Sequence, residues 1–390
     1  MADRSLAELD ALTLTAGIWF VAKFLRYAFP PLFPTFRELY GVSGGDLGLA
    51  FSGLMVVYAL TQFPSGAVAD RLGPVRVIAA GAVLAAAAAF VLSTGVTFAL
   101  LVACMLAVGL GTGVHKTVAI GLLSRVYPAT TGRALGVLDT VGAFGGVAAP
   151  LLVVAATDTV GWDAVFLGAA VLGLVLAAGF VRRVPRHAAV SRPEDPGDRT
   201  PLRAYAALFQ DTRFTAFVLV TIGFGFAYNG VVAFLPLYLT DAAGLDPGLA
   251  GVLYSALFVV SLVQLATGEL GDRLGSLTVS AATISLATLG LAGVLLVDTP
   301  VLLGVCVVAF GLGSHGFRPV RGAHLVALVP ESLAGGGLGV VRTLLMGAGA
   351  LAPAIVGAVG EAASYRVSFA VLLAALAASA VGATALHRTA

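Results

Sequence analysis

Six basic side chains lie inside stretches of this chain that are otherwise apolar. They are Lys23, Arg26, Lys116, Arg318, Arg321 and Arg342, and one carboxylate, Asp139, lies in a comparable position. Near the centre of a membrane helix, a Lys or Arg costs roughly 2.5–3.5 kcal/mol on translocon scales. Because the chain supplies so little negative charge there, the excess needs a ligand, a mobile ion or water. These residue types favour an anion, for which Arg offers a planar fork and Lys a point charge.

Two pairs of these cations have the spacing of neighbours on a helix. Lys23 and Arg26 are three residues apart, and so are Arg318 and Arg321. Each pair therefore shares one helix face and can present two charges to the same ligand. We expect Lys116 to add a further charge to the site, and Arg26 and Arg321 to contact the anion most directly.

Each cation also has a structural interpretation, because a long basic side chain can reach the membrane surface or pair with a carboxylate. Lys116 can pair with Asp139, and so can Arg342. Asp139 is then either neutralised by a cation or poised to take a proton. His115 and His324 are candidate proton carriers, with a helix–helix hydrogen bond as the commoner alternative. Candidate neutral donors, with helix packing as the alternative for each, are Tyr58, Gln62, Tyr228, Asn229, Tyr254 and Gln264.

The elements that carry these residues are predicted to be membrane helices. The chain of 390 residues is 59% hydrophobic and 11% charged, with a mean hydropathy of +1.01, which no soluble globular domain matches. Apolar stretches of about 20 residues recur along its length, and each can span a bilayer as a helix. The twelve predicted spans are 12–36, 47–69, 75–94, 98–125, 134–157, 161–181, 214–240, 248–270, 277–297, 300–328, 335–360 and 364–386.

Basic residues outside the spans predict the orientation of the chain. One side holds Arg71, Arg76, Arg125, Arg133, Arg273 and a basic cluster between 182 and 213, and the other side holds Arg37 and Arg366. Because short loops rich in Lys and Arg stay in the cytoplasm, we expect both termini there. The Arg-, Asp- and Pro-rich stretch 182–213 reads as a cytoplasmic linker between a six-helix half at 1–181 and another at 214–390.

The two halves repeat one another in sequence. "GAVADRLG" at 66–73 matches "GELGDRLG" at 268–275 with an offset of 202, which also pairs Lys116 with Arg318. "LGVLDTVGAFGGVAAP" at 135–150 matches "LGVVRTLLMGAGALAP" at 338–353 with an offset of 203, which pairs Asp139 with Arg342. We expect an all-α membrane protein of two pseudo-twofold-related halves, with a site between them near the midplane.

A glycine-rich motif follows the second span of each half, with the pattern G-x-x-x-D-R-x-G. Its residues are Gly66, Asp70, Arg71 and Gly73, echoed by Gly268, Asp272, Arg273 and Gly275. With this motif and the repeat, the chain resembles the major facilitator superfamily of secondary transporters. It departs from the family pattern at Pro74 and Ser276, where a basic residue is usual. The resemblance implies a gating role for the motif and a central cavity lined by the spans 12–36, 98–125, 214–240 and 300–328, which hold five of the six cations.

The predicted function is secondary active transport of a small organic or inorganic anion across the cell membrane by alternating access. "GLGTGVHK" and the following "GRALGVLDTVGAFGGVAAPLL" are similar to the fosmidomycin-resistance and the nitrate- or cyanate-type branches of the superfamily. We expect a monomer, with protons as the candidate coupling ion. No zinc or haem ligand spacing and no phosphate-binding loop occur in the sequence, so neither enzyme activity nor a cofactor or metal is expected.

Two other functions compete with this prediction. The first is a proton-coupled exporter of lipophilic drugs, whose members usually have an Arg at the position of Met105 and G-P-x-x-G-G where this chain has only Ala149 and Pro150. A positive cavity would also repel cationic drugs. The second is a membrane receptor or sensor that binds an anion without moving it.

Overall fold

The computed structural model describes residues 2–157, 159–184, 206–330 and 334–389, and the side chains of these except 2–8, 63 and 334–339. Within these ranges every regular element is a helix, and eleven helical spans are long and apolar enough to cross a membrane. A further long helix, α1 (Ala2–Ala28), carries Lys23 and Arg26 and is not one of these eleven spans. The predicted all-α membrane architecture is therefore confirmed.

Helix bounds follow the predicted spans closely. In the first half the long helices are α1, α3 (Gly44–Leu72), α4 (Pro74–Leu92), α5 (Phe98–Val126), α6 (Thr131–Thr157) and α7 (Asp163–Arg183). In the second they are α9 (Thr212–Leu237), α10 (Pro247–Val259), α11 (Val263–Leu274), α12 (Ser276–Leu296), α13 (Pro300–Leu328), α14 (Ala334–Ala362) and α15 (Tyr365–Arg388).

Three predicted spans are interrupted. The first ends at Ala28 and gives way to a 3₁₀ turn at Pro30–Leu32 and a short helix, α2 (Phe33–Tyr40), because consecutive prolines remove the backbone donors that a helix needs. The span predicted at 248–270 is divided into α10 and α11 by a 3₁₀ turn at Val260–Leu262. After α9, the chain continues through a π-helical turn at Tyr238–Ala242.

Two compact units divide the chain. The first contains Met1–Val42 and Ala50–Asp195, and the second contains Ser43–Leu49 and Pro196–Ala390. The first residues of α3 thus group with the second unit, where the Gly45 amide donates to a Glu361 carboxylate oxygen at 3.1 Å. Most of the predicted linker, 185–205, lies outside the described residues.

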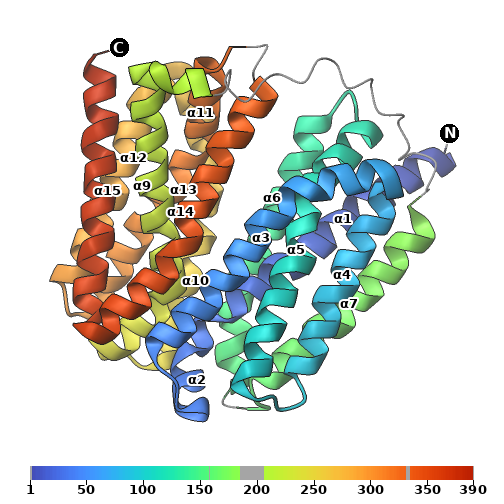
Figure 1. Ribbon diagram of the computed structural model, residues 1–390, viewed down its shortest axis with the longest axis horizontal. Coiled ribbons are helices and arrows are strands. Elements are labelled where there is room, and N and C mark those ends of the chain that lie inside the picture. Colours follow the sequence, from blue (N-terminus) through green and yellow to red (C-terminus); the bar gives the residue numbers. More distant parts are fainter. Residues whose placement is uncertain (1, 158, 185–205, 331–333, 390) are drawn as a thin grey trace. The chain divides into compact units, whose positions relative to one another are not determined.

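Matching helices pack together in the two units (Figure 1). In the first unit, α1 packs against α6 and α7, and α4 packs against α5 and α7. In the second, the repeat counterparts do the same: α9 packs against α14 and α15, and α12 packs against α13 and α15. The sequence repeat is therefore a repeat of packing as well.

The packing of the two units also corresponds at individual glycine contacts. A methyl group at Gly111 of α5 would overlap the backbone of α4 at Gly81 and Ala85. A methyl group at Gly313 of α13 would overlap the backbone of α12 at the positions 202 residues further on. Small residues let membrane helices approach this closely, so each of the two glycines sets one helix spacing.

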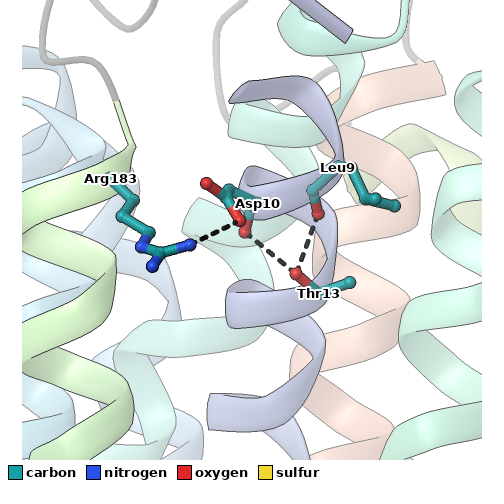
Figure 2. A network of polar contacts seen from close by, with 4 residues as sticks. All are labelled: Leu9, Asp10, Thr13 and Arg183. Atoms are coloured by element: carbon teal, nitrogen blue, oxygen red, sulfur yellow. Dashed lines mark hydrogen bonds and ion pairs between the residues drawn. The ribbon is translucent and has the colours of Figure 1, made fainter. Parts of the chain in front are cut away.

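A polar contact joins the two ends of the first half (Figure 2). An Arg183 guanidinium nitrogen at the end of α7 lies 3.6 Å from a carboxylate oxygen of Asp10 on α1. One turn along, the Thr13 hydroxyl donates to the Leu9 carbonyl at 2.8 Å. Because the Arg183 side chain is 69% exposed, we expect this pair to orient the two helices and to contribute little stability.

The glycine contacts give the first prediction. Gly111→Ala is expected to destabilise the protein by about 1–3 kcal/mol, because the methyl group meets backbone that has no rotamer to change. The measurement is the thermal unfolding midpoint of the purified protein in detergent. Gly136→Ala on α6 is the matched control, since a methyl group there meets nothing within 4 Å. An equal shift for both variants would contradict the close contact.

Candidate functional site

One face of α1 presents a tryptophan and two cations. Trp19, Lys23 and Arg26 follow one another at intervals of four and three residues, so they lie on the same side of the helix. The Lys23 Nζ lies 5.7 Å from the centroid of the Trp19 ring, and the Arg26 Cζ lies 5.3 Å from it. The sequence predicts the two cations here and does not predict Trp19, although this spacing is a signal that could have identified it.

The neighbouring helix α5 brings two more side chains to the same ring. The imidazole of His115 stacks on Trp19, with 5.6 Å between the ring centroids and 13° between the planes. The Lys116 Nζ lies 5.6 Å from the Trp19 centroid. Three cations thus lie within the range of a cation–π attraction to one indole. We call Trp19, Lys23, Arg26, His115 and Lys116 the Trp19 cluster.

The Asp139 carboxylate forms an ion pair with the cluster. Lys116 donates to an oxygen of Asp139 on α6. The lysine side chain is 14% exposed, whereas that of Asp139 is 60% exposed. Of the two roles considered for Lys116, pairing with Asp139 is the one that this geometry displays. The carboxylate is therefore the more open partner of the pair.

Arg26 lies deepest among the cations of the first unit. It is 6% exposed, and its Nε donates to the Ala22 carbonyl at 3.3 Å. Its Cζ lies 4.0 Å from the centroid of the Tyr58 ring, so the guanidinium lies near two aromatic rings. No carboxylate of the described residues forms an ion pair with it. Because a guanidinium stays charged, this buried cation strongly favours an anion nearby.

The second unit places its cations over aromatic rings too. The Arg318 Cζ lies 4.6 Å from the Tyr228 ring centroid, and the Arg321 Cζ lies 5.8 Å from that of Phe317. By the offset of 202, Tyr228 is the counterpart of Arg26, and Arg318 is the counterpart of Lys116. The two units therefore exchange roles: the first-helix position is a cation in one unit and an aromatic ring in the other.

The two histidines predicted as proton carriers are both packed among helices. Both ring nitrogens of His115, which is 1% exposed, lack a hydrogen-bond partner within the described part of the chain. The Nδ1 of His324 lies 2.9 Å from the Ser276 hydroxyl, and its ring meets Phe217 edge-on at 4.4 Å. His324 thus makes the helix–helix hydrogen bond that is the alternative to proton transfer. Arg342 is exposed on α14.

Three of the neutral candidates bond to helix backbone. The Tyr254 hydroxyl donates to the Val232 carbonyl at 2.8 Å. The side-chain amides of Asn229 and Gln264 donate to carbonyls in their own helical segments, also at 2.8 Å. These contacts match the packing alternative, whereas Tyr58 and Tyr228 present their ring faces to arginines.

The two copies of the glycine-rich motif form matching turns between helices. The last glycines, Gly73 and Gly275, have φ angles of +88° and +90°, which favour glycine. The acidic and basic residues before them are exposed, and Arg273 pairs with Glu269 one turn earlier. The remaining motif residues are Gly66, Asp70, Arg71, Gly268 and Asp272. The two glycines explain the sharp turn at the end of each motif.

The ion pair generates the second prediction. Asp139→Asn is expected to destabilise the protein by about 1–3 kcal/mol, because Lys116 loses the carboxylate that balances a mostly buried charge. Lys116→Met should cost less in the Asp139→Asn background than in the parent. A double-mutant cycle on thermal or denaturant unfolding measures the coupling. Strictly additive effects would show that the pair contributes nothing to stability.

Comparison with known proteins places this architecture in a family. The profile of the Major Facilitator Superfamily matches residues 15–314. The riboflavin transporter RibZ of Clostridioides difficile is 22% identical, over 80% of this chain and 79% of its own. The probable sulfoacetate transporter SauU of Cupriavidus necator is 28% identical, over 66% and 61%. The chloramphenicol resistance protein of Streptomyces lividans is 29% identical, over 83% and 86%.

A solved structure agrees with the fold. A bacterial homologue of the human lysosomal transporter Spinster superposes with a TM-score of 0.81 at 15% identity, covering 97% of this chain and 96% of its own. With the matched profile, the repeated six-helix packing and the paired glycine-rich motifs, the conclusion is direct. The chain belongs to the Major Facilitator Superfamily of membrane transporters.

Proposed function

We propose that this transporter moves a small organic or inorganic anion across the cell membrane by alternating access. The observation that carries the proposal is Arg26, a buried guanidinium surrounded by aromatic rings and without a carboxylate partner in the described structure. An anion in contact with it would supply the missing negative charge. We further propose a monomer with both termini in the cytoplasm.

Aromatic rings suit such a site because they support cations without neutralising them. A ring face attracts a cation through its quadrupole and carries no net charge. A carboxylate in the same place would compete with an anionic ligand. Arg26, Arg318 and Arg321 all lie near ring faces, so each guanidinium keeps its charge for a carboxylate, sulfonate or phosphate group. Sulfoacetate, the solute in the name of the probable transporter SauU, carries a carboxylate and a sulfonate.

Asp139 offers a route for coupling to protons. In the structure it forms an ion pair with Lys116, and this pairing weakens the attraction of the lysine for an anion. Protonation of Asp139 would remove that competition and release Lys116 to the ligand. We propose that the proton and the anion therefore bind together, with Asp139 as the proton acceptor.

The glycine-rich motif has a separate proposed role. Asp70 and Arg71 are exposed at the end of α3, and neither is among the cations that lie near the Trp19 ring. We propose that the motif acts on the balance between transport conformations, and that the cations of the two units act on substrate affinity.

The third prediction tests anion binding. Arg26→Gln and Arg318→Ala should each weaken anion binding by about 1–3 kcal/mol, the scale of a hydrogen bond to a charged group. Calorimetric titration with sulfoacetate and other small carboxylates and sulfonates measures the loss. Arg366→Gln is the control, because Arg366 pairs with Asp298 at 3.0 Å in an exposed position. Strong coupling between Arg26 and Arg318 in a double-mutant cycle indicates a shared ligand, whereas unchanged affinity in both single variants contradicts the proposal.

The fourth prediction concerns the driving ion. Asp139→Asn should abolish stimulation of anion uptake by an inward proton gradient, because the amide has no site for the transported proton. Exchange of internal for external anion should persist. Both are measured in proteoliposomes with a labelled anion. An Asp139→Asn variant that responds to the gradient as the parent does would rule out Asp139 as the acceptor.

A second candidate function has one observation in its favour. The chloramphenicol resistance protein is similar over more than four-fifths of both chains, so export of a lipophilic drug is the competing function. Proteoliposomes distinguish the two: chloramphenicol movement without anion movement favours export, and the reverse favours the proposed function. Anion binding without uptake would instead indicate a receptor.

A further inference from the structure

We propose that Trp19 is the positioning residue of the anion site in the first unit, and that Gly142 of α6 determines where its indole lies. This inference rests on the proposed anion function for its ligand, but the placement of the indole is open to an independent test. Trp19 is 3% exposed, and three cations and one imidazole surround its ring.

The ring is the feature that these cations have in common. Lys23 and Arg26 come from α1 and Lys116 from α5, and each lies 5.3–5.7 Å from the indole centroid. Like charges gathered in a medium of low dielectric constant repel one another. The electron-rich face of an indole attracts each of them, so it holds together charges that would otherwise move apart. Asp139 performs this function for Lys116.

Packing fixes the indole, because no hydrogen bond does. The Trp19 Nε1 has no hydrogen-bond partner in the part of the chain that the structure describes. Its edge lies directly against Gly142, where a methyl group would overlap Cδ1 and Nε1. One turn further along α6, a methyl group at Gly145 would instead overlap the backbone of Phe20. Gly145 thus sets the distance between the helices, whereas Gly142 makes room for a single side chain.

The second unit shows that the fold does not require this arrangement. α9 and α14 pack as α1 and α6 do, yet the counterparts of Trp19 and Gly142 are Thr221 and Leu345. There the large side chain belongs to α14: Leu345 packs into the space left by Gly225. Either helix can supply the bulk that fills this interface. The packing of Trp19 against Gly142 is therefore specific to the first unit. It places an aromatic face among three cations.

The sequence has two tryptophans. The experiment uses the full chain with Trp162→Phe, so that Trp19 is the one that remains. Gly142→Ala should lower the affinity for sulfoacetate about tenfold at constant ionic strength, the effect of losing roughly one desolvated cation–π contact. Gly136→Ala, on the same helix with nothing within 4 Å, should leave the affinity unchanged. Trp19→Phe added to Gly142→Ala should recover most of the loss, because the smaller ring fits beside the methyl group. Equal affinities for the Gly142 and Gly136 variants, or no recovery on adding Trp19→Phe, would overturn the proposal.

Trp19 emission gives a readout that needs no ligand. Gly142→Ala should shift the emission maximum, and Gly136→Ala should not. If the parent does not bind sulfoacetate, the proposed function fails for this anion, and the emission of these two variants then decides the inference alone. Should Gly142→Ala not fold, Lys116→Met replaces it, since removing a cation beside the ring must change the emission. An unchanged Trp19 emission in the variant used would overturn the inference.

Discussion

A positive charge that cannot be neutralised is the constraint on which the interior of this transporter depends. A guanidinium group stays charged in proteins, and that of Arg26 lies buried where water cannot solvate it freely. Three partners can lower the free energy of such a group: a carboxylate, an aromatic ring or a mobile anion. The chain supplies the ring, through Tyr58 and Trp19. A ring stabilises the cation without neutralising it, and the proposed reversible binding of an anion requires a charge that is not neutralised.

Both units place cations beside aromatic rings, but the cation and the ring occupy exchanged positions in the two units. In the first unit, the helix α1 provides both the ring and the cations, and α5 adds Lys116. In the second, α9 provides the Tyr228 ring and α13 provides Arg318. Lys116 is tied to Asp139, whereas at the position matching Asp139 the second unit has Arg342. The proposed proton acceptor is thus confined to one unit, and the packing repeats in both units while the proposed chemistry does not.

Composition and periodicity predicted the fold well because membrane insertion acts on average polarity over about 20 residues. Those averages do not report backbone donors, so the interruptions at Pro30 and at Val260–Leu262 were not predicted. The cation pairs on α1 and α13 could be predicted because spacing alone places them on one helix face. Spacing also places Trp19 on that face of α1, but it does not show that the indole lies against a glycine on another helix. The pairing of Lys116 with Asp139 remained one of two possibilities, since depth in the membrane does not determine which way a side chain points.

The change of offset between the two halves has a consequence for how such a protein can diverge after gene duplication. Four residues connect α5 to α6, and five connect α13 to α14. One residue inserted within a helix would rotate every later side chain by about 100° around its axis, turning a polar face toward lipid. When the extra residue lies between two helices, the side chains of each helix stay on the same faces as before. Changes of length are therefore tolerated between helices, and residues inside the helices differ in identity, so two halves of one repeat can handle charge differently.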